Sequence, residues 1–220
     1  MTKVDTVYTA EADVELLTKI IGKRVFFFAD GATVYPDALA LHKLFVFPAD
    51  ASPWQLELEW KLDYIEDPFT PFGNLCVCES LKPEGQESIS ILAKDATDAE
   101  IEYSGAYSAA KPGATAIDLR QFNEVVSLHF LQKHSISDER LKEKSPELDG
   151  IDSDGCLVFE LRGEISLAYH SHHASSGADD MTVELVRTRT LPNYFSQRRV
   201  RLSVGPGQDL RKISPVVPVS

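Results

Sequence analysis

The chain has 220 residues, 43% hydrophobic and 25% charged, which is the composition of a globular protein with enough apolar residues for its own core. Its net charge of −12 argues against a general nucleic-acid binder and against a protein that binds anionic membranes. No apolar stretch approaches the roughly 20 residues that span a bilayer, and we expect no signal peptide. The three cysteines, an odd number, favour a reducing compartment, so we expect a cytoplasmic protein.

One helix and about five strands are predicted in the first 95 residues. Apolar residues recur at helical spacing over residues 10–21, and Gly22 follows as a stop. From Trp54 to Tyr64 apolar and polar residues alternate at every position, as in a strand whose successive side chains point to opposite faces. A proline-rich loop is expected over residues 67–73. The predicted strands cover residues 25–28, 44–47, 54–64, 74–80 and 88–92.

The second half begins with a change in composition. Residues 95–118 are rich in small residues and predict a long connection, with a short helix near 97–102. A broad apolar arc over residues 118–134 predicts a second helix. The charged residues 137–149 predict a solvated helix or linker. Turns are expected at Asp154-Gly155 and Arg162-Gly163. The predicted strands cover residues 156–161, 164–172, 181–191 and 198–204.

These elements predict a mainly β (α+β) protein. We expect a bent antiparallel sheet, or a β-barrel or sandwich, of about nine strands with two flanking helices. Strands in blocks, without alternating helices, argue against a doubly wound parallel sheet. A single domain over residues 1–220 is expected, although two parts, 1–95 and 118–213 joined by 96–117, are an alternative. Both parts place a helix before strands, but their residues show negligible similarity, so an internal duplication stays a second option.

The alternating strand carries an aromatic stripe. Trp54, Trp60 and Tyr64 share one of its faces. Such a stripe forms either part of the core or the wall of a cavity for a small apolar ligand. A buried indole N–H needs a hydrogen-bond partner, which a cavity wall often supplies.

The densest group of titratable side chains covers residues 169–173. On a strand, His170 and His172 share a face, within reach of a common ligand or metal ion. After Gly163, this H-x-H pair resembles the first half of the cupin metal motif. The glutamate that cupins carry a few positions later is absent here, and so is their second motif. We therefore expect no metal and no other cofactor. A polar strand end is the leading interpretation of the two histidines, and a metal ligand or a general base is the alternative.

Other patterns do not indicate a site. Cys76 and Cys78 share one face of a predicted strand without a second pair, which is typical of buried small side chains and not of zinc ligands. Residues 149–155 look like a calcium loop, but Gly150 and Leu161 stand where its first and last carboxylates belong, so a turn is predicted. There is no G-x-S-x-G elbow, and serine, histidine and aspartate are too abundant for a triad to be assigned.

Basic residues gather near the C-terminus, where seven arginines and lysines follow position 186 against one aspartate. They either neutralise acidic neighbours or form an arginine face that recognises a carboxylate, a phosphate or an acidic partner. On the strand predicted over 198–204, Arg199 and Arg201 share one face. Aligned arginines require something negative nearby.

No motif identifies a reaction or a catalytic residue, so the sequence leaves open whether the protein is an enzyme. The leading hypothesis is a soluble, non-catalytic binding protein for a small apolar ligand or a protein partner, which could form a homodimer. The alternative is a small β-barrel enzyme, an isomerase, cyclase or hydrolase with histidine or carboxylate acid–base groups and with or without a metal. The candidate ligand-binding residues are Trp54, Trp60, Tyr64, His170, His172, Arg199 and Arg201.

Overall fold

The computed structural model describes residues 3–30, 33–34, 39–48, 54–64, 71–81, 86–94, 100–108, 115–117, 123–136, 148–171 and 181–208. These residues form fifteen strands, two α-helices and one 3-10 helix. The mainly β class and the bent antiparallel sheet are confirmed. The sheet is open and does not close into a barrel. It contains more strands than the nine expected.

The elements follow the chain in two groups. The first comprises β1 (Lys3–Val7), α1 (Glu11–Thr18), β2 (Arg24–Asp30), β3 (Thr33–Val34), β4 (Leu39–Leu41), β5 (Lys43–Pro48), β6 (Trp54–Tyr64), β7 (Pro71–Leu81), β8 (Gln86–Lys94) and β9 (Glu100–Ser108). The second comprises β10 (Thr115–Ile117), β11 (Asn123–Ile136), β12 (Leu148–Leu161), β13 (Ile165–Ser171), β14 (Met181–Arg187), the 3-10 helix η1 (Thr188–Thr190), α3 (Leu191–Ser196) and β15 (Arg199–Val204).

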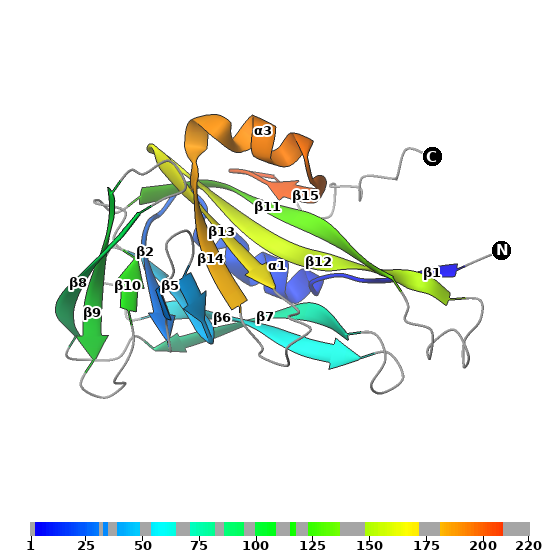
Figure 1. Ribbon diagram of the computed structural model, residues 1–220, viewed down its shortest axis with the longest axis horizontal. Coiled ribbons are helices and arrows are strands. Elements are labelled where there is room, and N and C mark those ends of the chain that lie inside the picture. Colours follow the sequence, from blue (N-terminus) through cyan, green and yellow to red (C-terminus); the bar gives the residue numbers. More distant parts are fainter. Residues whose placement is uncertain are drawn as a thin grey trace.

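Thirteen strands form one sheet that folds back over itself in two layers (Figure 1). The upper layer contains β11 to β14, with β15 beside β11, and the lower layer contains β2 and β5 to β7. The layers join where β11 meets β2, with Asn123 opposite Val25. Neighbouring strands run antiparallel except β1, which pairs with β12 in parallel. Strands β8 and β9 form a separate hairpin.

The main core lies between the two layers. Apolar side chains from both layers and from α1 are buried there, among them Phe27 and Phe159, whose rings meet edge to face at 5.2 Å. Trp60 of β6 packs against Tyr169 of β13, with ring centroids 5.9 Å apart. Removing this apolar surface from water is the main force that holds the layers together.

The upper layer also has an outer face, which α3 covers (Figure 1). Because side chains alternate along a strand, Leu157 and Phe159 point into the main core while Cys156 and Val158 point outward. Leu191 and Tyr194 of α3 pack on these outward residues, which form a second, smaller cluster. This outer face carries the polar groups described below.

The predicted second helix over residues 118–134 is wrong, because residues 123–136 form strand β11. Its pairing with β12 shifts register between Val125 and Ser127 and again after Leu131. Each bulge adds a residue and interrupts the two-residue alternation. Val125 and Leu128, three positions apart, therefore share the inner face with Phe130, while Leu131 is buried on the outer face, and together these positions resemble the apolar arc of a helix.

Three further expectations differ from the structure. The predicted connection and short helix over residues 95–118 contain strands β9 and β10 instead. The predicted turn over 149–155 is part of β12, where Gly155 leaves room for the Lys133 side chain that a Cβ atom would meet at 2.5 Å. The strand predicted over residues 181–191 ends at Arg187, and residues 188–191 are helical, consistent with Pro192 near the start of α3.

The other predicted elements agree with the described residues. The first helix falls within its predicted range, and the alternating strand has the predicted bounds, Trp54–Tyr64. Strand β7 begins at Pro71, so it includes the last three residues of the loop predicted over 67–73. Residues 67–70 and 137–147, for which a loop and a solvated helix or linker were predicted, lie outside the described residues.

Candidate functional site

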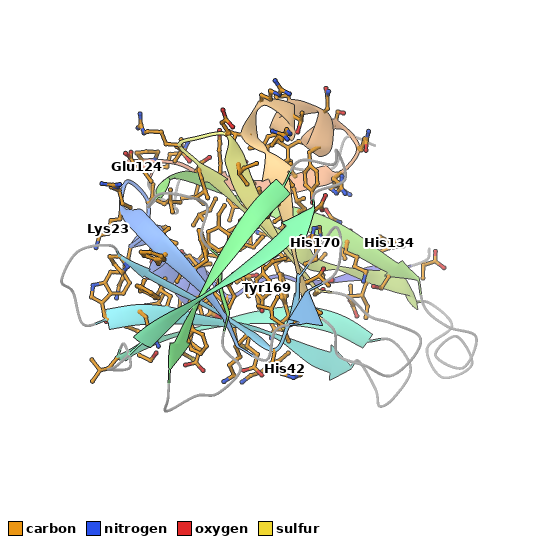
Figure 2. The ribbon with its side chains drawn as sticks, turned by 60° about the vertical axis from the view of Figure 1, so that its left-hand side comes forward. Lys23, His42, Glu124, His134, Tyr169 and His170 are labelled. Carbon is orange, nitrogen blue, oxygen red and sulfur yellow. The ribbon has the colours of Figure 1, made fainter. Side chains whose placement is uncertain are left out.

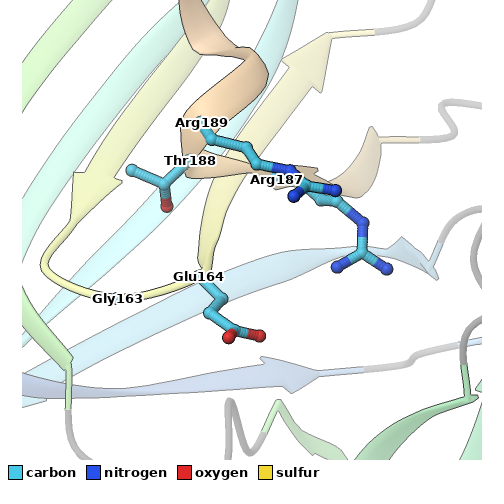
Figure 3. Close-up of a pocket in the computed structure, with 5 residues that line it drawn as sticks. All are labelled: Gly163, Glu164, Arg187, Thr188 and Arg189. Atoms are coloured by element: carbon cyan, nitrogen blue, oxygen red, sulfur yellow. The ribbon is translucent and has the colours of Figure 1, made fainter.

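A pocket of about 400 Å³ opens at the end of the upper layer, beside η1 (Figure 3). The turn between β12 and β13 provides Gly163 and Glu164, and the junction of β14 with η1 provides Arg187, Thr188 and Arg189. The two segments are tied together because the Thr188 backbone N–H donates to the Glu164 carbonyl oxygen at 2.8 Å. Two guanidinium groups and one carboxylate thus line one small cavity.

The floor of this pocket is held by a short chain of hydrogen bonds. The Thr188 hydroxyl lies 2.9 Å from the Ser166 hydroxyl, and the Ser166 oxygen accepts a hydrogen bond from the Leu161 backbone N–H at 3.1 Å. Ser166 is fully buried. Because Thr188 is anchored in this way, the flanking arginines Arg187 and Arg189 start from a fixed backbone.

The guanidinium groups of the pocket are groups that can bind an anion. Figure 3 shows the side chains of Arg187 and Arg189 reaching in the same direction, with the Glu164 carboxylate below them. A guanidinium group binds a carboxylate or phosphate with two parallel hydrogen bonds. Arg189 is exposed, whereas Arg187 is half-buried and already has an interaction within the protein. Glu164 can accept a hydrogen bond from a donor on the same ligand.

A polar cluster lies on the outer face of the upper layer, beneath α3. It contains Cys156, His170, Glu184 and Tyr194. His170 Nε2 lies 3.1 Å from Glu184 Oε2 and 3.0 Å from the Tyr194 hydroxyl. The same hydroxyl donates to Glu184 Oε2 at 3.2 Å, and Cys156 Sγ lies 3.9 Å from His170 Nε2. Figure 2 shows His170 on the side of Tyr169 that is nearer to α3.

The electrostatics of this cluster favour a charged carboxylate and neutral tyrosine and thiol groups. The hydrogen bond with His170 lowers the pKa of Glu184 although burial opposes it. Burial raises the pKa of Tyr194, and it also raises the pKa of the Cys156 thiol. A buried thiol whose pKa is raised is a poor nucleophile. The hydrogen bonds of this cluster therefore link α3 to β13 and β14.

The predicted aromatic residues are only partly described. Trp60 is 3% exposed and belongs to the main core. Trp54 is half-buried against that core, and Lys23 Nζ lies 4.7 Å from the centroid of its ring. The side chain of Tyr64 and all of His172 lie outside the described residues. Trp60 of the lower layer packs in the core on the inner face of the upper layer, whereas His170 lies on the outer face of the upper layer, so the structure does not bring them into one site.

The two predicted arginines of β15 have different environments. Arg201 makes two hydrogen bonds of 2.7 Å with the carboxylate of Asp154, which is 1% exposed. Its guanidinium group also lies 4.5 Å from the centroid of the Tyr8 ring. Arg199 is exposed. The negative group expected near Arg201 is therefore internal.

Sequence reasoning did not assign the pocket residues, although two signals for them were present. Arg187 and Arg189 were counted in the basic C-terminal segment, and the Arg162-Gly163 turn was predicted. Their meeting depends on the pairing of β13 with β14, where Ile165 lies opposite Arg187. Within the described part of the chain, no three histidine, cysteine or acidic side chains are grouped as metal ligands would be.

Comparison with protein-family models, with curated proteins and with solved structures finds no match to this chain. Of the helices in the described residues, none is both long enough and apolar enough to cross a membrane.

Proposed function

We propose that this protein is a binding protein that recognises an acidic segment of a protein partner. The pocket of Glu164, Arg187 and Arg189 would receive a carboxylate from that segment. The observation that carries this proposal is the presence of two guanidinium groups in one cavity of about 400 Å³. Arginine in a pocket is a frequent anchor of protein interfaces because its planar group makes paired hydrogen bonds.

Two features favour a peptide carboxylate over a small apolar ligand. The cavity lies toward the small end of ligand pockets, and three of the five residues that line it are charged. Glu164 would repel a purely anionic ligand, but it can accept a hydrogen bond from a backbone N–H group. A peptide that carries an acidic side chain offers both groups to the pocket.

The test uses a fluorescent peptide of six glutamates and measures its binding by fluorescence anisotropy at low and high salt. We expect binding by the wild-type protein, weakened by salt because charges are screened. The double variant Arg187→Gln/Arg189→Gln should bind at least about tenfold more weakly, which corresponds to about 1.4 kcal/mol. Glu164→Gln should bind this all-acidic peptide more tightly, because it removes a like charge.

The matched control is Arg162→Gln. Arg162 is a neighbouring exposed arginine that hydrogen-bonds to Glu124 at 2.9 Å and does not line the pocket. It should leave the affinity within about twofold of wild type, as expected for a surface charge outside the interface. Equal loss in the control and in the double variant would mean that the peptide responds only to overall charge, and the proposal would be wrong.

A further inference from the structure

A second histidine on the outer face, His129 of β11, lies between two partners from neighbouring strands. The Ser203 hydroxyl of β15 is 2.8 Å from His129 Nδ1, and Glu160 Oε2 of β12 is 3.0 Å from His129 Nε2. His129 and Ser203 are directly opposite in the pairing of β11 with β15. The three groups thus form a continuous line, serine to histidine to carboxylate, across three strands.

The hydrogen bonds determine which nitrogen of His129 carries the proton. The Ser127 hydroxyl also donates to Glu160 Oε2. Burial alone would raise the pKa of Glu160, but the hydrogen bonds from Ser127 and His129 outweigh it and lower that pKa. An ionised carboxylate can only accept hydrogen bonds, and the Ser127 oxygen, whose proton goes to Glu160, accepts from His129 Nε2 at 2.9 Å, so Nε2 carries the proton. Nδ1 is then free of a proton and accepts the hydroxyl of Ser203.

The surroundings protect the imidazole and leave the serine open. The Phe195 ring of α3 lies 4.7 Å from the His129 ring, centroid to centroid, and the His129 side chain is 12% exposed. Ser203 is exposed. A base that is held in one orientation beside an accessible hydroxyl is the arrangement that activates a serine nucleophile, whatever the fold around it.

We propose that Ser203 is a nucleophilic serine, that His129 is its general base, and that Glu160 is the positioning residue for His129. The substrate class is small carboxylic esters, because such molecules can reach an exposed serine on an open sheet face. This site is distinct from the arginine pocket, and the proposal does not rest on the binding function.

The reaction follows from these roles. Ser203 Oγ attacks the ester carbonyl carbon while its proton passes to His129 Nδ1. The carbonyl carbon–alkoxy bond then breaks, and the departing alcohol takes that proton, leaving an ester on Ser203. A water molecule next attacks this ester and gives a proton to His129. The bond to Ser203 Oγ breaks, the oxygen recovers the proton, and a carboxylic acid is released.

The experiment treats the full chain with a fluorophosphonate probe and locates the label by mass spectrometry, and it measures hydrolysis of p-nitrophenyl acetate in parallel. We expect labelling at Ser203 and slow ester hydrolysis. Ser203→Ala should abolish both. His129→Ala should slow labelling at least about a hundredfold, the usual contribution of a general base. Ser196→Ala, which removes another exposed serine of the same region, should behave as wild type.

The role of Glu160 is tested by a measurement that would stay unchanged if Glu160 were only structural. In Glu160→Gln, the amide no longer fixes the proton of His129 on Nε2 as the carboxylate does, so the pH profile of labelling should differ from that of wild type. Glu160→Asp should restore the wild-type profile in part. Circular dichroism verifies that every variant is folded. Absence of labelling in the folded wild type, labelling that persists in Ser203→Ala, or labelling as fast in urea as in buffer would each overturn the proposal.

Discussion

Among single residues, Asp154 has an unusual environment, because its carboxylate is 1% exposed and still ionically paired. Arg201 donates two hydrogen bonds to it, and the Thr9 backbone N–H donates a third at 2.9 Å. These bonds join β15, β12 and the segment that leads into α1. A buried charge with such partners is stable only as long as the partners remain.

We therefore predict that Arg201→Gln destabilises the protein by about 3–5 kcal/mol, the usual cost of leaving a buried charge unpaired. Urea denaturation measures the free energy of unfolding. Arg199→Gln, two positions earlier on the same strand and exposed, is the control and should change it by less than about 0.5 kcal/mol. Equal effects of the two substitutions would contradict the internal role of Arg201.

Among the secondary-structure elements, α3 depends on its tertiary contacts for stability. It has six residues, too few for an isolated helix to be stable in water. Leu191 and Tyr194 pack on the outer face of the upper layer, and the Tyr194 hydroxyl bonds to His170 and Glu184. Arg198 adds a contact of 3.7 Å to the centroid of the Tyr194 ring. The polar cluster therefore contributes to the attachment of α3.

The attachment of α3 should depend on pH through Glu184. Its pKa in the folded protein lies below its ordinary value of 4.5, so the ionised carboxylate stabilises the folded state. That contribution is complete above pH 4.5 and is lost as the pH falls through the lower, folded-state pKa. We expect the unfolding free energy of wild type to fall between about pH 6 and about pH 3, and that of Glu184→Gln to fall less. Urea titrations at both pH values measure this difference, and parallel losses would contradict it.

At the scale of the whole molecule, the two layers come into close contact where Gly73 of β7 meets Ser171 of β13. A Cβ atom at position 73 would lie 2.6 Å from Ser171 Oγ and 2.7 Å from Ser171 Cβ. The Ser171 hydroxyl is buried and has no hydrogen-bond partner among the described residues. The absence of a side chain at Gly73 is therefore a condition for the close approach of the layers.

We predict that Gly73→Ala destabilises the protein by about 1–3 kcal/mol, as extra atoms in a packed interior usually do. Adding Ser171→Gly removes both clashing atoms and should recover part of the loss. Thermal and urea unfolding of the two single variants and the double variant give the coupling between the positions. If the two effects simply add, the layers are not in contact at this point.

The sequence by itself determined the fold class and several elements. The alternation from Trp54 to Tyr64 predicted both the bounds of β6 and the burial of Trp60, because alternation is a local property of an extended backbone. The sequence also indicated an arginine-rich C-terminal segment. The tertiary structure decided what pairs with what. Only the bulged pairing of β11 with β12 separates a strand from the helix that residues 118–134 resemble.

The candidate sites depended still more on distant residues. Ser203 and His129 are 74 positions apart, and no local pattern marks either as a partner of the other. Glu164 meets Arg187 and Arg189 only because β13 pairs with β14. Local backbone preferences act over a few residues and are readable from the chain, whereas strand pairing joins positions whose separation is not encoded in either neighbourhood. For that reason the sequence alone determined which residue types are available to these sites, and the folded sheet determined their geometry.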